Sequence, residues 1–276
     1  MAQKIAFQGE LGAYSHEACI KARPDFEPLP CATFEDVFAA VTSGAADLAM
    51  LPVENSTYGR VADMHRLLPK SGLHILDEVF IRVRICLLAL PGVMLEDIKV
   101  ARGHLVILPQ CRTFLESNGI TGEAAADNAG AAADIAKHDE RDAAALASAL
   151  AGEIHGLRVV AEDIEDHSTN TTRFLVMGRT PDHARRADKM LTTFVFQVRN
   201  IPAALYKAMG GFATNGVNMT KLESYMVGGK FQATQFYVDI EGHPDNKNVK
   251  LALEELGFFT DQLTILGTYP VADERG

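Results

Sequence analysis

The segment IAFQGELGAYS (residues 5–15) joins a short apolar run, a loop with two glycines and the beginning of a helical pattern. We predict a buried strand at residues 5–7, a turn at residues 9–12 and a helix that Ser15 caps. A strand that passes through a glycine turn into a helix is the repeating unit of α/β proteins. The segment therefore predicts an α/β fold.

The same alternation of apolar runs and helical patterns continues to about residue 180. Thr33 and Asp36 have the spacing of a capping box, so we expect a helix to begin there. Pro109 can open another helix, and Gly119 follows its expected end. The other predicted strands are residues 47–53, 79–90, 143–146, 157–164 and 173–177, and the other predicted helices are residues 129–137 and 148–154. Two α/β lobes with a cleft between them account for this order, and such a cleft suits a small ligand.

The composition changes after residue 179. Residues 180–189 are basic and poor in apolar side chains, and we interpret them as a solvated linker. The predicted elements that follow are strands at residues 193–198, 217–226, 231–240 and 263–266, helices that begin at Pro202 and Pro244, and a hairpin turn at Gly228-Gly229. The second helix is expected to stop at Gly257. The order βαββαβ predicts a ferredoxin-like unit.

Charge and composition exclude several classes of protein. A net charge of −10 over 276 residues argues against a protein that coats nucleic acid or an anionic membrane, since both need a basic surface. We see no signal-peptide pattern and no run of about 18 apolar residues, so we expect a cytoplasmic protein with no nucleic-acid or membrane partner. The cysteines at positions 19, 31, 86 and 111 are widely spaced, which indicates a reducing compartment, no structural zinc and a role as small apolar filler.

Four segments, in this order, resemble the signature stretches of prephenate dehydratases: AFQGELGAYS (residues 6–15), PVENSTYGRV (residues 52–61), QCR (residues 110–112) and NTTRF (residues 170–174). The C-terminal unit resembles the ACT domain that follows the catalytic region in this family. The resemblance implies a catalytic domain of two lobes, like a periplasmic binding protein, followed by a linker and a regulatory ACT domain. The implied boundaries are residues 1–180 for the catalytic domain (lobe 1 about 1–78 and 160–180, lobe 2 about 79–159), 181–190 for the linker and 191–272 for the ACT domain.

The reaction implied by the resemblance is the loss of CO₂ and hydroxide from prephenate, which gives phenylpyruvate in L-phenylalanine biosynthesis. Aromatisation drives this reaction, so no metal, flavin or nicotinamide is required and no cofactor is expected. The reaction does need a hydrogen-bond or proton donor for the departing 4-hydroxyl, and a fixed pose for two carboxylates. The expected catalytic residues are Thr172, Asn55, Gln110 and Glu54.

Thr172 offers a hydroxyl donor to the leaving oxygen. Because a threonine hydroxyl is a poor acid at neutral pH, we expect it to polarise the leaving group or to relay a proton from Glu54 or water. For Glu54, a structural role in capping a nearby backbone amine stays open beside proton transfer. Arg173 can hold a carboxylate with two hydrogen bonds, and Phe174 can form a wall against the ring. The expected substrate-binding residues are Arg173, Phe174, Ser56, Ser15 and Thr171.

The chain departs from the family pattern at three places. Gly103 stands where the family has a serine, so a donor to the substrate is missing there. In the ACT-like unit, Ala203 replaces a glycine and Tyr225-Met226 replaces an arginine-proline pair. Because alanine restricts the positive φ that glycine allows, we expect phenylalanine feedback in a weakened or altered form. The expected effector residues are Pro202, Ala204, Leu205, Asn218, Glu223 and Ser224, and the expected assembly is a homodimer or homotetramer through the ACT domains.

Two other functions stay open. Arogenate carries an amino group in place of the keto oxygen of prephenate, and the residue types do not separate an arogenate dehydratase from a prephenate dehydratase. A non-catalytic cytosolic small-molecule sensor would use the same two lobes. Thr172 distinguishes this sensor from an enzyme, because a sensor needs groups that hold carboxylates but no donor at a leaving hydroxyl.

Overall fold

The computed structural model divides into two compact units. It describes residues 2–199, 201–226 and 233–275. Unit 1 comprises Met1–Arg60 and Val79–Phe174, and unit 2 comprises Val61–Glu78 and Leu175–Gly276. The chain therefore passes between the units three times, and residues 61–78, which the sequence assigns to the first lobe, pack with the C-terminal part of the chain.

The first lobe of unit 1 is a largely parallel sheet with two helices. Its elements are β1 (Lys4–Gln8), α1 (Tyr14–Ala22), β2 (Glu27–Cys31), α2 (Phe34–Ser43), β3 (Leu48–Asn55), β4 (Gly59–Arg60) and the beginning of β11 (Thr171–Gly178). β1 pairs in parallel with both β2 and β3, and β11 lies beside β3. This arrangement confirms the predicted α/β fold class.

The two predicted helix starts of this lobe have different outcomes. The capping box of Thr33 and Asp36 is present at the beginning of α2, as predicted. Ser15, however, does not cap α1: the N-cap residue is Ala13, whose carbonyl accepts hydrogen bonds from the N–H groups of His16 and Glu17. The prediction for Ser15 was wrong because the helix begins two residues earlier than a Ser15 cap requires and therefore includes Ser15.

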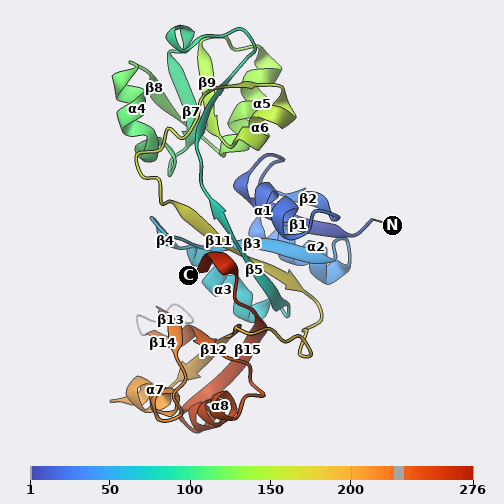
Figure 1. The fold of residues 1–276 in the computed structure, drawn as a ribbon, viewed down its shortest axis with the longest axis vertical. Helices are drawn as coiled ribbons and strands as arrows, with labels where there is room; N and C mark the ends of the chain where they lie inside the picture. Colours follow the sequence, from blue (N-terminus) through green and yellow to red (C-terminus); the bar gives the residue numbers. More distant parts are fainter. Residues whose placement is uncertain (1, 200, 227–232, 276) are drawn as a thin grey trace. The chain divides into compact units, whose positions relative to one another are not determined.

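The second lobe of unit 1 is a five-stranded sheet of order β10-β6-β9-β7-β8, with α4 on one side and α5 and α6 on the other (Figure 1). Its elements are β6 (Cys86–Ala89), η2 (Leu95–Asp97), β7 (Val100–His104), η3 (Leu108–Cys111), α4 (Arg112–Ser117), β8 (Thr121–Ala125), α5 (Asn128–His138), β9 (Ala143–Ala147), α6 (Ala149–His155) and β10 (Arg158–Ala161). Every residue of β9 is buried, which agrees with its uninterrupted apolar sequence.

The predicted strand at residues 79–90 is in fact two strands. β5 (His74–Arg82) ends before Val83, and β6 begins at Cys86. The N–H of Val83 donates to the carbonyl of Asn170 (2.8 Å), and the N–H of Ile85 donates to the side chain of Glu165 (3.0 Å). Because these amides bond to another segment, one sheet ladder cannot run through residues 83–85. The predicted strand at residues 157–164 is likewise shorter, ending at Ala161.

Gly12 lies where the two lobes of unit 1 touch. Its φ is +96°, and a Cβ atom there would lie only 2.6 Å from the Cα of Ala151 on α6. Ser148, which caps α6, donates from its hydroxyl to the carbonyl of Gly12 (2.6 Å). The position therefore requires glycine both for its backbone conformation and for the close approach of α6.

Unit 2 contains an antiparallel sheet of order β13-β14-β12-β15, with α7 and α8 packed on one face (Figure 1). Its elements are α3 (Ala62–Leu67), η1 (Leu68–Lys70), the beginning of β5, β12 (Met190–Val198), α7 (Ala204–Thr214), β13 (Met219–Met226), β14 (Ala233–Glu241), α8 (Lys247–Phe259), β15 (Thr260–Pro270) and η4 (Asp273–Arg275). From β12 onward the order is the predicted βαββαβ. The hairpin turn predicted at Gly228-Gly229 lies outside the described residues.

The end of α8 differs from the prediction. The helix continues through Gly257 to Phe259 and passes directly into β15 at Thr260. A glycine ends a helix where the chain must adopt a left-handed conformation. Gly257 has no positive φ, so nothing at this residue interrupts the helix.

The basic linker is held at two points within unit 2. Residues 179–189 form neither helix nor strand, as predicted. Arg185 Nη1 lies 2.9 Å from Asp77 Oδ1, and Arg186 pairs with Asp245. These two arginines anchor the linker, whose residues are otherwise largely exposed, as predicted for a solvated connector.

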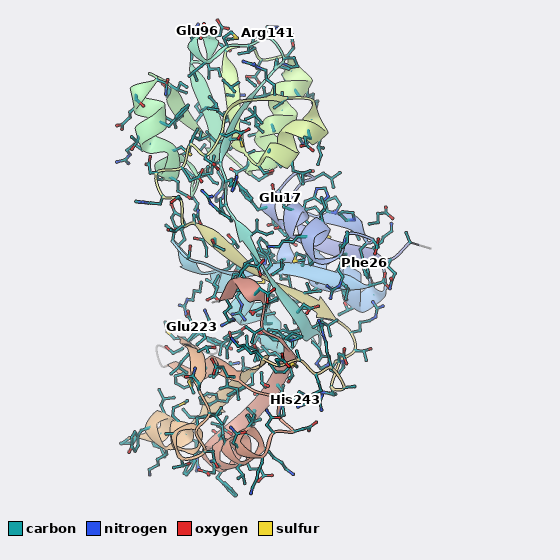
Figure 2. All side chains as sticks on the ribbon, in the orientation of Figure 1. Glu17, Phe26, Glu96, Arg141, Glu223 and His243 are labelled. Atoms are coloured by element: carbon teal, nitrogen blue, oxygen red, sulfur yellow. The ribbon has the colours of Figure 1, made fainter. Side chains whose placement is uncertain are left out.

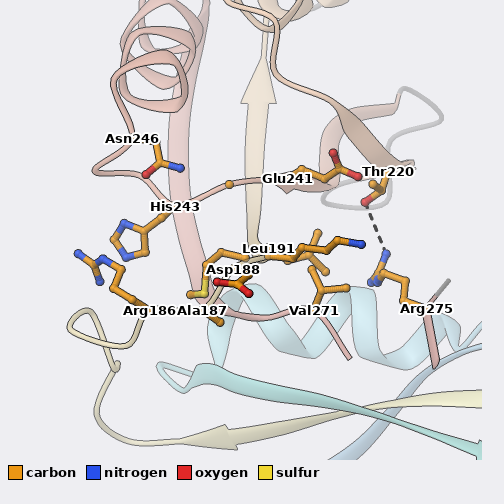
Figure 3. Close-up of a pocket in the computed structure, with 13 residues that line it drawn as sticks. Arg186, Ala187, Asp188, Leu191, Thr220, Glu241, His243, Asn246, Val271 and Arg275 are labelled. Atoms are coloured by element: carbon orange, nitrogen blue, oxygen red, sulfur yellow. Dashed lines mark hydrogen bonds between the residues drawn. The ribbon is translucent and has the colours of Figure 1, made fainter. Parts of the chain in front are cut away.

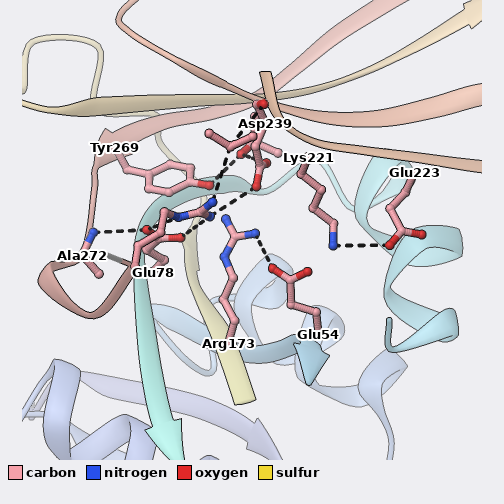
Figure 4. A network of polar contacts seen from close by, with 11 residues as sticks. Glu54, Glu78, Arg173, Lys221, Glu223, Asp239, Tyr269 and Ala272 are labelled. Carbon is pink, nitrogen blue, oxygen red and sulfur yellow. Dashed lines mark hydrogen bonds and ion pairs between the residues drawn. The ribbon is translucent and has the colours of Figure 1, made fainter. Parts of the chain in front are cut away.

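Arg275 joins three segments of unit 2 near the C-terminus, and its partners Glu78 and Asp239 are labelled in Figure 4. Its Nε and Nη2 donate to the two oxygens of Glu78 at 3.0 and 2.8 Å, and Nη2 lies 3.3 Å from Asp239 Oδ2. Thr193 donates from its hydroxyl to the other oxygen of Asp239 (2.7 Å). Two buried carboxylates, one on β5 and one on β14, are thus tied to one guanidinium.

Candidate active site

Asn55 and Thr172 lie on neighbouring strands of the first lobe. Asn55 is the last residue of β3, and Thr172 is the second residue of β11. The Nδ2 atom of Asn55 is 3.0 Å from Thr172 Oγ1 and 2.6 Å from Asn170 Oδ1. Asn170 in turn donates to Gln110 Oε1 from the second lobe. The structure therefore brings together three of the four predicted catalytic residues, Asn55, Thr172 and Gln110.

The groups at the two ends of this amide chain fix the orientation of all three amides. Asn55 Oδ1 accepts hydrogen bonds from the backbone N–H groups of residues 57–58, both at 2.9 Å, and these groups can only donate. At the other end, Gln110 Nε2 donates to the carbonyl of Val106 (2.8 Å), which can only accept. The amide of Asn170 connects the two. None of these three side-chain amides can be turned round without placing two donors or two acceptors opposite each other.

The hydroxyl of Thr172 is left as a hydrogen-bond donor. Its oxygen accepts a hydrogen bond from Asn55 Nδ2, and among the described residues its proton has no hydrogen-bond acceptor. The Thr172 side chain is only half-buried. A hydroxyl that accepts from a fixed amide has its own proton to direct elsewhere. Thr172 can therefore donate a hydrogen bond to an oxygen of a bound molecule.

Glu54 and Arg173 lie on the same two strands as Asn55 and Thr172, but on the opposite face of the sheet. Successive side chains in a strand point to opposite sides, so the neighbours of Asn55 and Thr172 face away from that pair. Arg173 Nη1 is 2.9 Å from Glu54 Oε1, and the Arg173 side chain is only 1% exposed (Figure 4). In the structure Arg173 thus pairs with a carboxylate of the protein, and Glu54 faces away from Thr172, which favours the structural role that the sequence left open for Glu54 over proton transfer.

Ser56 and Phe174 also differ from their predicted roles. The hydroxyl of Ser56 donates to the carbonyl of Thr169 (3.0 Å) and accepts from the N–H of Thr171 (2.9 Å). Since serine has a single hydroxyl proton, Ser56 holds the beginning of β11 and has no donor left for a substrate. Phe174 is on the same side of β11 as Thr172, but it is 2% exposed and belongs to the core. Phe174 therefore packs in the core beneath the site and does not present its ring to a ligand.

The loop at residues 9–12 is held by the helix that follows it. Ser15 is buried on α1, and the next residue, His16, accepts a hydrogen bond at Nδ1 from the N–H of Gly12 (3.0 Å). Burial lowers the pKa of His16, which keeps the imidazole neutral and able to accept. Figure 2 labels Glu17, the next residue of the same helix. Burial raises its pKa, while a side-chain hydrogen bond with Ser148 opposes that rise. The Gly12 amide is therefore used within the protein.

Gly103 lies in a crowded position on β7. A Cβ atom there would be 3.1 Å from Leu146 Cβ and 3.3 Å from Asn128 Oδ1. The same Asn128 oxygen accepts from the N–H of His104 (2.8 Å), and His104 Nδ1 accepts from the N–H of Val106 (3.3 Å). Asn128 and His104 thus shape the loop that presents the Val106 carbonyl to Gln110.

The described residues contain no cluster of three or more His, Cys, Asp or Glu side chains placed to hold a metal ion. No helix in the described part of the chain is long and apolar enough to cross a membrane. Cys19, Cys86 and Cys111 are buried, as expected for apolar filler, whereas Cys31 is half-buried. Burial raises the pKa of Cys19 and of Cys111 to about 12, so neither thiol is a nucleophile near neutral pH.

Comparison with known proteins identifies the family of this chain. Residues 5–182 match the family model described as prephenate dehydratase. The chain belongs to the prephenate dehydratase family. A Komagataeibacter europaeus protein, named bifunctional N-acyl-homoserine lactone acylase/prephenate dehydratase, is 48% identical and is matched over 98% of this chain and 97% of its own length. An Arabidopsis thaliana protein, named arogenate dehydratase/prephenate dehydratase 2, is 40% identical over 97% of this chain and 73% of its own length.

Solved structures of similar proteins extend over both units. One, described as a novel type of quorum-quenching acylase, has a TM-score of 0.93 and 47% identity and covers 99% of this chain and 100% of its own. A prephenate dehydratase from Arthrobacter aurescens, described as a complex with L-Phe, has a TM-score of 0.90 and 29% identity over 98% of this chain and 91% of its own. The likeness to prephenate dehydratases therefore includes the C-terminal unit.

Three of the effector residues expected from the prephenate dehydratase resemblance, Pro202, Ala204 and Leu205, lie at the beginning of α7. Ala203, which stands where the family has glycine, is the N-cap residue of this helix and has a φ of +62°. An alanine in this conformation is strained by about 1 to 2 kcal/mol. The chain therefore keeps the backbone conformation of a glycine at the cost of strain.

The other three expected effector residues lie on or beside β13. The carbonyl of Asn218 accepts from the N–H of Glu241 (3.0 Å), which joins β13 to β14. Glu223 Oε1 lies 3.4 Å from Lys221 Nζ, and the two side chains share one face of the strand. Ser224 is exposed on the opposite face. Glu223 and Ser224 therefore cannot contact one small ligand from the same side of β13.

A cavity of about 700 Å³ lies in unit 2 at the end of the sheet near the linker (Figure 3). It is bounded by the linker, by the C-terminal ends of β14 and β15 and by His243, which is buried. Its charged and polar lining includes Arg186, Lys189, Thr220, Glu241, His243 and Arg275. None of the expected effector residues is among the described residues that line it.

Asn170 is a functional candidate to which the sequence assigned no role of its own. It begins the NTTRF segment but was not among the predicted site residues. Its side chain contacts Asn55 and Gln110, and only 2% of the residue is exposed. The available signal was a polar residue inside a motif followed by an apolar strand, since a buried amide must find partners for all its polar atoms.

Proposed function

We propose that this chain converts prephenate to phenylpyruvate. The hydrogen bond from Asn55 Nδ2 to Thr172 Oγ1 (3.0 Å) carries the proposal, because it leaves the Thr172 hydroxyl as a donor. A hydroxyl directed at the 4-oxygen of prephenate would stabilise negative charge on that oxygen as it leaves. Membership of the prephenate dehydratase family, by a match over residues 5–182, supports the same reaction.

The reaction needs few bond changes. The bond between the ring and its carboxylate breaks and releases CO₂, and its electron pair enters the ring. The C–O bond at C4 breaks, and the departing oxygen takes up one proton and leaves as water. Prephenate and one proton thus give phenylpyruvate, CO₂ and water. Thr172 donates a hydrogen bond to the departing oxygen, and water supplies the net proton, because a threonine hydroxyl does not ionise near neutral pH.

The surroundings of Thr172 suit a substrate with two negative charges. Asn55 and Gln110 are neutral, so they position groups without repelling a dianion. Of the two other predicted substrate contacts, Thr171 precedes Thr172 on β11 and so points to the opposite face, and its hydroxyl donates to the carbonyl of Thr169 (3.4 Å). Ser15 on α1 remains our proposed substrate contact. Glu54 and Arg173 support the site through their own ion pair. The reaction is driven by aromatisation, and the proposal includes no cofactor.

The C-terminal unit is proposed to be an ACT domain that binds L-phenylalanine and forms a homodimer or homotetramer. The βαββαβ order supports this proposal, as does the 29% identical Arthrobacter aurescens structure described with L-Phe. β13 is at one edge of its sheet and exposes Leu222 and Met226, which suits pairing with a second chain. The free cysteines support a cytoplasmic location. Calorimetric titration with L-phenylalanine and sedimentation analysis test these points.

The experiment for the main proposal measures phenylpyruvate from prephenate and, separately, phenylalanine from arogenate, both at neutral pH. Arogenate is included because the 40% identical Arabidopsis thaliana relative is named for both activities. Turnover of prephenate with the higher kcat/KM is the expected result. If the chain turned over arogenate but not prephenate, the substrate would be arogenate. If it bound prephenate without turning it over, the non-catalytic sensor function would hold instead.

A second candidate function is hydrolysis of an N-acyl-homoserine lactone, the other activity in the name of the 48% identical relative. One observation favours it. Leu105 and Val106 are 67% and 40% exposed in the loop next to Gln110, where apolar side chains suit an acyl chain better than a dianion. Release of the fatty acid and homoserine lactone from such an amide in the presence of this chain would support the second function. Loss of that release in a Leu105→Ser variant would locate it at this loop.

A further inference from the structure

We propose that Asn170 is a positioning residue of the dehydratase site, which joins the two lobes of unit 1 and sets the geometry of the Thr172 donor. The inference rests on the proposed function and adds a residue to it. Asn170 contacts Asn55 of the first lobe at 2.6 Å and Gln110 of the second lobe through the two ends of one amide. Its backbone carbonyl accepts from the N–H of Val83 (2.8 Å), at the residue after β5 ends.

Asn170 determines where the second proton of the Asn55 amide points. The two N–H bonds of an amide lie in one plane about 120° apart. One of them is held by Asn170 Oδ1, so the other is directed at Thr172 Oγ1, 3.0 Å away. Loss of the Asn170 oxygen would let the Asn55 amide tilt, and the Thr172 hydroxyl would lose its fixed direction.

Asn170 also makes this geometry depend on the second lobe. Its Nδ2 is paired with Gln110 Oε1, and Gln110 Nε2 is paired with the carbonyl of Val106 (2.8 Å). A second connection runs parallel to it, since the Tyr58 hydroxyl donates to the same carbonyl (3.1 Å). Thr172 is therefore aligned when both lobes are in contact, and the alignment passes through an amide that need not touch the substrate.

Asn170→Asp tests the direction of these hydrogen bonds. An ionised aspartate can accept from Asn55 but sets an oxygen against Gln110 Oε1, and Gln110 cannot turn round because the Val106 carbonyl only accepts. A protonated aspartic acid has one acceptor and one donor and restores both bonds. Since the site is 2% exposed, burial raises the pKa of an aspartate placed there.

The expected result is a pH-dependent defect. In Asn170→Asp, kcat should fall about 100-fold at pH 8, as expected for a misplaced donor, and recover toward the wild-type value by pH 5. Asn170→Ala should lose kcat at every pH with KM within about threefold of wild type. Asn118→Asp is the matched control, because the Nδ2 of Asn118 donates within its own helix, to the Phe114 carbonyl (2.8 Å). The ratio of its kcat to the wild-type kcat should not change with pH.

Thermal unfolding gives a second readout that does not need turnover. The pKa of the introduced carboxyl is higher in the folded than in the unfolded chain, so the Tm of Asn170→Asp should match wild type at low pH and fall below it as pH rises. A kcat ratio and a Tm difference that both stay constant with pH would overturn the positioning role while leaving the dehydratase function intact. Failure of the wild-type chain to turn over prephenate would instead overturn the proposed function, and the role of Asn170 with it.

Discussion

Asn55 Nδ2 donates a hydrogen bond to Thr172 Oγ1 across 3.0 Å, between the end of β3 and the beginning of β11. The direction of this bond is fixed, because Asn55 Oδ1 is occupied by two backbone N–H groups. Thr172 is thus an acceptor toward the protein and a donor toward a ligand. The neighbouring residue of each strand, Glu54 on β3 and Arg173 on β11, faces the other way and contributes an ion pair. Two short segments therefore carry both the proposed chemistry and the support for it.

Gly12→Ala should destabilise the protein by about 3 kcal/mol, because the added Cβ meets Ala151 and the positive φ is strained. Gly44→Ala is the matched control: Gly44 has a φ of +84° but no atom within 4 Å of an added Cβ. It should cost about 1 to 2 kcal/mol, from backbone strain alone. Urea unfolding measures both. Equal losses in the two variants would argue against a close approach of α6 at Gly12.

Breaking the ion pair between Glu54 and Arg173 should affect stability more than turnover. Arg173 is 1% exposed, so Glu54→Gln removes one charge of a buried ion pair, at a cost of about 3 kcal/mol. Arg173→Met should also destabilise, and the double variant should lose less than the sum of the single losses. Urea unfolding of all three variants gives the coupling energy. Strictly additive losses would show that the two side chains act independently.

Ala203→Gly should stabilise the protein by about 0.5 to 1 kcal/mol, because relief of the strained φ of +62° exceeds the extra entropy of an unfolded glycine. Ala208→Gly in the interior of the same helix should instead destabilise by about 1 kcal/mol or more. Denaturant unfolding compares the two variants. In calorimetry, L-phenylalanine should bind the Ala203→Gly variant more tightly than the wild type. Destabilisation by Ala203→Gly would show that no strain is stored at this residue.

The cysteines should differ in reactivity. Burial raises the pKa of Cys19 and Cys111 to about 12, so about one thiol in ten thousand is ionised at pH 8. The pKa of Cys86 is raised to about 11, and Cys31 is half-buried with a smaller rise. Iodoacetamide at pH 8 should label Cys31 first in the native protein and all four in urea, as mass spectrometry can show. First labelling at Cys111 would contradict its burial.

Local sequence signals predicted most of the fold. The capping box at Thr33 and the alternation of apolar residues after residue 193 were sufficient for α2 and for the βαββαβ unit. The predictions failed where tertiary contacts override local pattern. The run at residues 79–90 is largely apolar, but its middle amides bond to residues 165 and 170, and no periodicity reveals that exchange. Gly257 likewise stays helical because the backbone does not turn left-handed there.

The sequence indicated several residues that lie together in the structure, but it indicated only part of what each residue contacts. The motifs correctly grouped Asn55, Gln110 and Thr172, which the structure joins through Asn170. Arg173 was assigned to the substrate because a guanidinium can hold a carboxylate with two hydrogen bonds, yet Arg173 and Thr172 are neighbours in a strand and face opposite sides. Which side of β11 faces the second lobe depends on how β3 and β11 pair, and that cannot be read from either segment alone. The same limitation affected Glu54.

The central claim is that the Thr172 hydroxyl donates to the departing oxygen of prephenate, and steady-state kinetics of Thr172→Ser and Thr172→Val test it most directly. Valine keeps the shape of threonine but has no hydroxyl, whereas serine keeps the hydroxyl. With prephenate at neutral pH, kcat for Thr172→Val should fall by about 100-fold or more with little change in KM, and Thr172→Ser should retain most of it. A Thr172→Val variant with wild-type kcat, or with a change confined to KM, would contradict the claim.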